Sequence, residues 1–216
     1  MKKLIIFDFD GTLLDTLTDM ANCTNYALEQ CGFPVHPVDA YKLFVGNGIL
    51  KLFERALPAS ARTEENIEKI RAQFVPYYDV HYMDMTAPYP GITKLLEVLQ
   101  GKGIQLAIAS NKYQSATETL AEHYFKNFSF TAVLGQREGV PIKPDPSIVY
   151  DIMKKAGVGK EEVLYVGDSG VDMQTARNAG ITAIGVTWGF RPSKELEQNG
   201  ATYIVDSPGE ILGLVE

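Results

Sequence analysis

The sequence has few of the features that mark secreted, membrane-spanning or zinc-binding proteins. Of its 216 residues only two are cysteines, Cys23 and Cys31. They lie about two helical turns apart, too far for a disulfide bond, and their number does not suggest zinc. The apolar run Leu4–Phe7 ends at Asp8, before the roughly 7–15 residues of a signal sequence, and no stretch approaches the roughly 18 of a membrane span. We therefore expect a cytoplasmic protein.

Positive charge is also scarce, with 20 Lys and Arg residues against 27 Asp and Glu and a net charge of −7. A general basic surface for nucleic acid is excluded on that balance. A small phosphorylated molecule remains a possible partner, because a metal ion and one or two basic side chains can supply positive charge locally. Hydrophobic residues make up 45% of the chain and charged residues 22%, as in ordinary globular proteins.

Short segments rich in Ile, Val and Leu alternate with segments of helical spacing from about residue 90 onward. The first group predicts buried parallel strands at Leu4–Phe9, Ile104–Ala109, Ala132–Leu134, Val163–Val166, Thr182–Thr187 and Thr202–Val205. The second predicts helices at Ile92–Gln100, Gln114–His123, Ile148–Ala156, Asp172–Ala179 and Lys194–Gln198. This order is typical of an α/β fold with a doubly wound parallel sheet.

The stretch from residue 15 to residue 84 interrupts that order, because it contains no convincing strand. It predicts helices at Leu17–Gln30, Val38–Phe44, Gly48–Leu57 and Glu64–Val80. An insertion directly after the first strand leaves the sheet at its carboxyl edge, where active sites of α/β proteins lie. We therefore expect a catalytic core of residues 1–14 and 85–216 and an inserted helical cap domain of residues 15–84.

Two aspartates follow the first predicted strand, in the sequence Asp8-Phe9-Asp10-Gly11-Thr12. Side chains two apart on a strand point the same way, so the two carboxyl groups emerge together. Two like charges so close require a cation or a proton between them. The alternative interpretation is an ordinary turn with solvated aspartates.

A second pair of acids, Asp168 and Asp172, follows the predicted strand Val163–Val166. Asp172 lies one helical turn beyond Asp168 and can face the same site, although Asp168 could instead cap the following helix. Acids delivered by two strands of one sheet make a site for a hard cation plausible. Oxygen ligands favour Mg²⁺ over zinc or copper.

Further polar residues follow other predicted strands. Ser110-Asn111 comes after Ile104–Ala109, and Lys143 lies in a loop stiffened by three prolines. Individually, a serine there is usually a cap and a loop lysine is usually solvated. Together with the acids they form a set of nucleophile, second acid, hydroxyl donor, fixed cation and metal ligand.

With these motifs the chain resembles the haloacid dehalogenase-like superfamily, and within it the phosphatases similar to phosphoglycolate phosphatase. The resemblance rests on Asp8-x-Asp10-Gly11-Thr12, Ser110-Asn111, Lys143-Pro144 and Gly167-Asp168-Ser169-x-x-Asp172, with weaker matches such as Val45-Gly46-Asn47-Gly48. It implies that Asp8 is the nucleophile that forms an aspartyl phosphate and that Asp10 is the general acid and base.

The resemblance also implies which residues bind Mg²⁺ and phosphate. Asp8, the backbone carbonyl of Asp10, and Asp168 would hold the metal, with Asp172 close behind to orient a metal-bound water or Lys143. Ser110, Lys143 and backbone amides near Gly11 and Asn111 would hold the phosphate. In the insertion, Asn47 and Arg55 are candidates for contacts with the substrate, although a solvated helix face is the alternative for Arg55.

The same resemblance ranks the possible activities. An acid at position 10 favours hydrolysis of a phosphate monoester or phosphomutase action over dehalogenation, and Met20 replaces a histidine that the mutases carry. We expect a phosphatase with phosphoglycolate as the leading substrate, and sugar phosphates, nucleotides or pyrophosphate as alternatives. A binding or regulatory protein without turnover is the alternative from another class. Both a monomer and a homodimer are compatible with the sequence.

Overall fold

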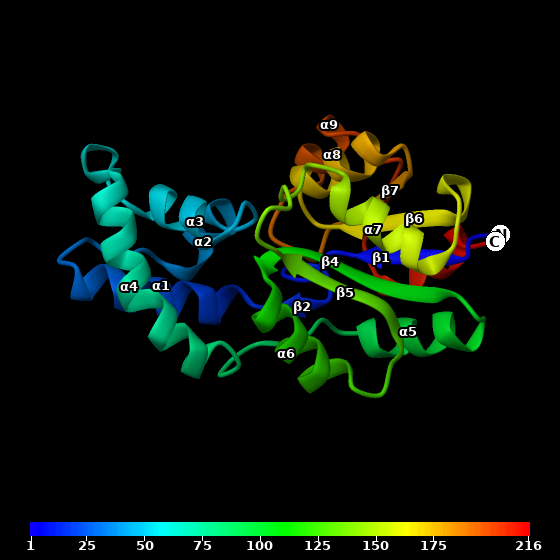
Figure 1. Ribbon diagram of the computed structural model, residues 1–216, viewed down its shortest axis with the longest axis horizontal. Coiled ribbons are helices and arrows are strands. Elements are labelled where there is room, and N and C mark those ends of the chain that lie inside the picture. The colour runs from blue at the N-terminus through cyan, green and yellow to red at the C-terminus, as the bar shows by residue number, and fades with distance from the viewer. The chain divides into compact units, whose positions relative to one another are not determined.

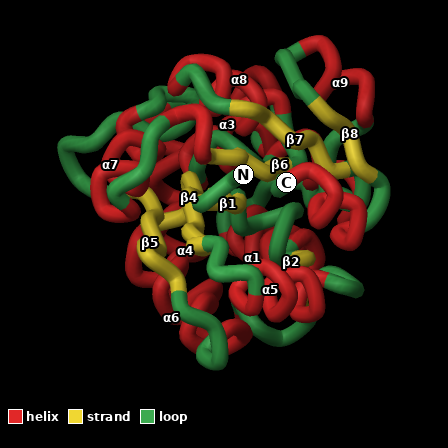
Figure 2. The backbone as a smooth tube through the Cα atoms, turned by 90° about the vertical axis from the view of Figure 1, so that its right-hand side faces the viewer, coloured by secondary structure: helices red, strands yellow, loops and turns green.

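A computed structural model describes residues 1–216 and contains one sheet of six parallel strands (Figure 2). The spatial order of the strands is β5-β4-β1-β6-β7-β8. Their bounds are Leu4–Phe7 for β1, Gln105–Tyr113 for β4, Phe130–Gln136 for β5, Val163–Gly167 for β6, Thr182–Val186 for β7 and Tyr203–Val205 for β8. Every neighbouring pair is parallel. The predicted doubly wound α/β fold is confirmed.

Helices cover both faces of this sheet (Figure 2). On one face α5 and α6 pack against β4, and on the other α7 and α8 pack against β5 and β6. These helices span Ile92–Gly101, Gln114–Phe125, Ser147–Ala156 and Gly170–Ala179, and the short α9 spans Ser193–Gln198. All four residues of β1 are fully buried. Because helices cover both faces of the sheet, the sequence of this buried strand is continuously apolar rather than alternating.

The direction in which the chain adds strands reverses beside β1. From β1 the chain continues to β4 and β5 on one side, and then crosses to β6, β7 and β8 on the other. In open α/β sheets this switch point opens a crevice at the carboxyl ends of the two central strands. The crevice here therefore lies at the ends of β1 and β6. The two chain termini lie together elsewhere on this unit (Figure 1), where the amide of Lys2 donates to the carbonyl of Val215 at 3.0 Å.

The chain divides into two compact units, one of residues 1–14 and 88–216 and the other of residues 15–87. The sequence predicts the end of the insertion at residue 84, three residues earlier. The chain crosses between the units at two short strands, β2 (Leu14–Asp15) and β3 (Ala87–Pro88), which form a separate two-stranded sheet. Neither strand has a sequence pattern from which it could be predicted.

The second unit is helical, as expected from the sequence. Its helices are α1 (Leu17–Gln30), α2 (Tyr41–Phe44), α3 (Ile49–Ala56) and α4 (Glu64–His81). Helices α1 and α4 pack together. Between them the rings of Tyr26 and Tyr77 are stacked, with their centroids 3.8 Å apart. No helix of the chain is both long enough and apolar enough to cross a membrane.

A buried carboxylate ties the beginning of this helical unit to its end. Asp19, on the first turn of α1, accepts hydrogen bonds from the amides of Met85 and Thr86 and from the Thr86 hydroxyl, at 2.8–3.0 Å. Asp19 and Thr86 are both buried. Hydrogen bonds to a charged acceptor in a buried site are among the stronger ones in proteins, so the two ends of the insertion are held side by side.

Candidate active site

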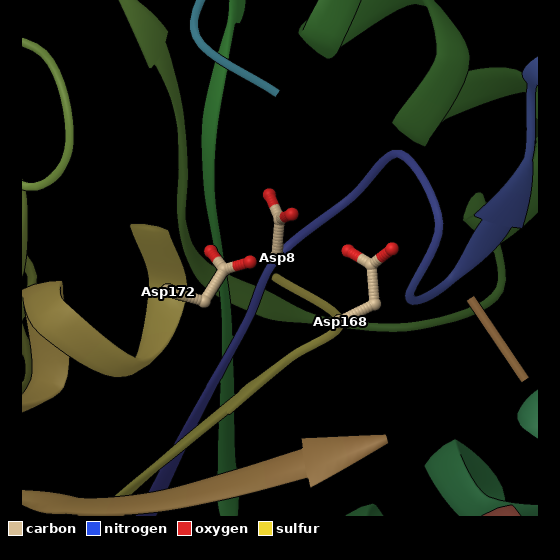
Figure 3. Close-up of side chains that lie close together, drawn as sticks. All are labelled: Asp8, Asp168 and Asp172. Atoms are coloured by element: carbon tan, nitrogen blue, oxygen red, sulfur yellow. The ribbon is translucent and has the colours of Figure 1, made fainter. Parts of the chain in front are cut away.

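Carboxylates from the ends of β1 and β6 converge on one space. Asp8 follows β1, and its amide donates to Val166 on β6 at 2.8 Å. Asp168 follows β6 directly, and Asp172 lies on the first turn of α8. Figure 3 shows their three carboxyl groups close together. One oxygen atom of each lies within 4.8 Å of the others. The predicted juxtaposition of Asp8 and Asp168 is therefore present.

Lys143 lies between two members of this acidic group, Asp8 and Asp172. Its ammonium nitrogen donates to Oδ1 of Asp8 at 2.7 Å, to Oδ1 of Asp172 at 2.7 Å and to the carbonyl of Ala109 at 2.9 Å. The residue is only 2% exposed. Asn111 fixes the backbone of the lysine, because its side-chain amide exchanges two hydrogen bonds with the N–H and C=O of Lys143. Asn111 therefore supports Lys143 through its side chain.

Both carboxylate oxygens of Asp172 already accept hydrogen bonds. Oδ1 accepts from Lys143 and, at 3.3 Å, from Tyr165, whereas Oδ2 accepts from the amide and the hydroxyl of Ser169. Ser169 in return accepts from the amide of Asp172, so the two residues form a capping box at the start of α8. Asp172 thus links Lys143 to α8, the helix on which Asp172 itself lies.

Burial and neighbouring charges shift the pKa values of these groups. Burial raises the pKa of Asp8 well above its usual range, and the neighbouring Asp172 adds to that effect while Lys143 partly offsets it. Burial and Asp172 also raise the pKa of Asp168 to about 7. For Lys143, burial acts to lower the pKa, but the carboxylates of Asp172 and Asp8 outweigh it and the pKa is raised. The lysine is therefore charged, whereas burial disfavours the charged forms of Asp8 and Asp168.

The loop after β7 closes tightly over Asp168, a contact that sequence reasoning missed. The amide of Phe190 donates to Oδ2 of Asp168 at 2.7 Å, and the indole N–H of Trp188 donates to the carbonyl of Thr12 at 3.0 Å. A side chain on Gly189 would overlap Asp168 and the backbone of Gly11. The donor to Asp168 is a backbone amide, which no residue pattern reveals.

Asp10 has a cationic partner that sequence reasoning also missed. The ammonium nitrogen of Lys112 lies 3.1 Å from Oδ1 and 3.2 Å from Oδ2 of Asp10, and it donates a hydrogen bond to Oδ2. Lys112 immediately follows Ser110-Asn111 in the sequence, and that position was the one available signal. The hydroxyl oxygen of Ser110 accepts from the amide of Lys112 at 3.1 Å, and both residues are buried.

The remaining predicted residues divide between the two units. Gly11 has a left-handed φ of 85°, and an added side chain would overlap the carboxylate of Asp168. Asn47 and Arg55 contact each other in the helical unit, where the guanidinium donates to Oδ1 of Asn47 at 2.6 Å and to the carbonyl of Phe44 at 2.9 Å. Contact of these two residues with a substrate stays a prediction.

The composition of this group fits a hard divalent cation. Four carboxylates and two ammonium groups leave two net negative charges when all are ionised, and every candidate ligand is an oxygen atom. Burial is the main cause of the raised pKa of Asp168, and a cation bound there would offset it. One oxygen each of Asp8 and Asp168 is not engaged by Lys143 or Phe190.

Three comparisons place the chain among known proteins. The family model for haloacid dehalogenase-like hydrolases matches residues 5–186. The phosphoglycolate phosphatase of Pasteurella multocida is 32% identical over 220 residues, which cover 99% of this chain and 98% of that protein. Among solved structures, a protein of Lactobacillus delbrueckii subsp. bulgaricus that is provisionally named a phosphoglycolate phosphatase is 36% identical, with a TM-score of 0.94 over 100% of this chain and 99% of its own. A counterpart from Haemophilus somnus is 30% identical, with a TM-score of 0.91 and coverage of 100% and 98%.

Proposed function

The chain belongs to the haloacid dehalogenase-like hydrolases, and we propose that it is a Mg²⁺-dependent phosphatase that forms an aspartyl phosphate on Asp8. The observation that carries this proposal is the convergence of Asp8 and Asp168, from two different strands, beside a buried Lys143. A nucleophile, a metal site and a fixed cation in one crevice are what phosphoryl transfer requires.

In the first step Asp8 attacks the phosphorus atom. The bond from one carboxylate oxygen of Asp8 to phosphorus forms as the bond from phosphorus to the leaving oxygen breaks, and Asp10 gives its proton to that leaving oxygen. The substrate leaves as an alcohol, and the phosphoryl group stays on Asp8 as an acyl phosphate.

In the second step water hydrolyses this acyl phosphate. Asp10, now a carboxylate, accepts a proton from the water as its oxygen bonds to phosphorus, and the bond between phosphorus and Asp8 breaks. Inorganic phosphate leaves, and both aspartates return to their starting states. One carboxyl group near the leaving oxygen thus acts as acid and then as base.

The surrounding groups neutralise the charge of the phosphoryl oxygens. Lys143 is the fixed cation, and the Ser110 hydroxyl and backbone amides near Gly11 and Asn111 are the candidate neutral donors. Asp8, the carbonyl of Asp10, and Asp168 would hold Mg²⁺, which when bound supplies positive charge between the nucleophile and the anionic substrate. Because both oxygens of Asp172 are engaged, we assign it to orienting Lys143 rather than to direct ligation.

We propose phosphoglycolate as the leading substrate, and we propose that the helical unit acts as the cap that selects it. The relatives named as phosphoglycolate phosphatases match the chain over nearly its whole length, the helical unit included. Within that unit, the guanidinium of Arg55 and the amide of Asn47 could pair with a small carboxylate.

A turnover screen over phosphorylated metabolites, with Mg²⁺ and with EDTA, tests the proposal. We expect metal-dependent release of phosphate, with the highest kcat/KM for phosphoglycolate. A panel on which no compound releases phosphate with Mg²⁺ would leave a binding protein as the better description. High turnover of another small phosphate would retain the chemistry and change the substrate.

A further inference from the structure

We propose that Lys112 is a positioning residue that holds the carboxyl group of Asp10 for proton transfer to the leaving group. This inference rests on the proposed phosphatase function and assigns a role to a side chain outside the predicted set. Lys112 would not touch the substrate. It would act through Asp10, by fixing the orientation of its carboxyl group toward the leaving group.

The sheet brings these two residues together. Strands β1 and β4 are neighbours in parallel register, with Phe7 opposite Ile108. Asp10 lies three residues after the end of β1, whereas β4 continues to Tyr113 with an irregularity between Ala109 and Tyr113. Lys112 therefore reaches Asp10 from the strand beside it, across a sequence separation of 102 residues.

The side chains of Lys112 and Asp10 differ in how far they are exposed to solvent. The side chain of Lys112 is 3% exposed and that of Asp10 is 14% exposed. The carboxylate is thus the more accessible group of the pair, and the ammonium group lies deeper in the protein. A buried ammonium group needs a compensating anion, and Asp10 supplies it. A substrate entering from solvent would meet Asp10 before Lys112.

Lys112 lies close to both carboxylate oxygens of Asp10. Its ammonium nitrogen donates a hydrogen bond to Oδ2 at 3.2 Å and lies 3.1 Å from Oδ1, which is buried and makes no hydrogen bond. The rotation of the carboxyl group about its χ2 bond is otherwise broad. A fixed cation in contact with both oxygens restricts that rotation, and so holds the carboxyl group in one orientation.

A residue that acts only through proton transfer affects substrates unequally. A p-nitrophenolate ion is a stable leaving group and needs little protonation, whereas the alkoxide of glycolate leaves only as it is protonated. Loss of Lys112 should therefore slow phosphoglycolate hydrolysis more than p-nitrophenyl phosphate hydrolysis. Loss of a direct phosphate contact would slow both alike and raise both KM values.

The test compares kcat and KM of K112M, K112R, D10N and D10N/K112M on these two substrates with Mg²⁺. We expect K112M to lower kcat at least about tenfold more for phosphoglycolate than for p-nitrophenyl phosphate. We expect K112R to recover part of that loss, because it keeps a donor toward Asp10. In the D10N background K112M should change the rate by less than about twofold, because residues that act as one unit are not additive.

Other outcomes are equally informative. Equal losses on both substrates, persisting in the D10N background, would overturn the proposal and indicate a direct phosphate contact or a purely structural role. Far-UV circular dichroism and thermal melting identify a folding defect, and if K112M fails to fold, K112Q provides the same comparison. A wild-type protein inactive on both substrates contradicts the proposed function itself, whereas an active protein with uniform K112M losses contradicts only this inference.

Discussion

The ammonium nitrogen of Lys143 lies 2.7 Å from Oδ1 of Asp8, and the same nitrogen lies 2.7 Å from Oδ1 of Asp172. One buried cation thus faces two carboxylates. The third acid, Asp168, is held by a backbone amide instead. These three acids form one buried cluster held by two different partners, so the contributions of Lys143 and of the amide can be tested separately.

Replacing Asp8 with Asn should abolish turnover and stabilise the metal-free protein. The variant keeps the shape of the side chain but removes the nucleophile, and we expect kcat to fall by about 10³-fold or more. Because burial raises the pKa of Asp8, its charged form is unfavourable in the fold. We therefore expect a higher Tm for D8N in EDTA at pH 8, measured by thermal melting beside a phosphatase assay.

D39N is the matched control, since the side chain of Asp39 is 87% exposed and pairs only with Lys42 at the surface. It should change neither activity nor Tm. Substantial activity in D8N would require another nucleophile.

Replacing Lys143 with Met should destabilise the fold as well as inactivate the enzyme. The change leaves Asp8 and Asp172 buried without their cation, a loss of about 3–5 kcal/mol in the free energy of unfolding. Urea unfolding at pH 8 measures it. K143R keeps the charge in a larger group and should lie between K143M and wild type. A K143M protein as stable as wild type would show that the ion pairs contribute nothing to stability.

The stability of the metal-free protein should fall as the pH rises from about 4 to about 7. Asp168 has a pKa of about 7 in the folded protein against an ordinary value of 3.8. In this range the folded state keeps a proton on Asp168 that the unfolded state has lost. The stabilisation that this proton gives the folded state is lost as the pH rises through about 7. The contribution of Asp168 levels off above that value.

Mg²⁺ competes with this proton, so it should raise Tm more at pH 8 than at pH 5. Melting curves from pH 5 to 8, with Mg²⁺ and with EDTA, measure both effects. D168N should remove the part of the pH dependence that Asp168 contributes, leaving that of Asp8, and most of the Mg²⁺ effect. The same Mg²⁺-induced rise in Tm at both pH values would contradict the assignment of Asp168 as a ligand.

Replacing Gly189 with Ala should disturb the proposed metal site without altering any charged residue. The added methyl group would overlap Asp168 and the Gly11 carbonyl, and crowding of this kind costs about 1–3 kcal/mol. We expect a weaker affinity for Mg²⁺ and a shifted fluorescence emission from Trp188, the one tryptophan of the chain. G209A is the control, because nothing lies within 4 Å of the added atom. Unchanged Mg²⁺ affinity in G189A would show that the loop does not position Asp168.

The fold and the acidic part of the site follow from the sequence because they depend on local patterns. Buried strands such as Val163–Gly167 are continuously apolar, and α1 has the bounds that its spacing predicts. In a parallel sheet the residues after neighbouring strands meet at one edge, so Asp8 and Asp168 could be placed together from their positions alone.

The contacts that support those acids could not be predicted in the same way. The pairing of Lys112 with Asp10 depends on how far β4 continues and on an irregularity in its register with β5. The contact of Phe190 with Asp168 uses a main-chain amide, and that of Trp188 with Thr12 uses a main-chain carbonyl. Such bonds depend on the path of a loop rather than on the kind of residue in it.

The paired crossings at β2 and β3 make the helical insertion a replaceable module. Its first and last residues, Asp15 and Ala87, belong to adjacent strands of one small sheet. All six charged residues assigned to the reaction, Asp8, Asp10, Lys112, Lys143, Asp168 and Asp172, belong to the other unit. An exchanged or shortened insertion would therefore leave the reactive groups on their original scaffold, and new selectivity could evolve by substituting one contiguous stretch of the gene.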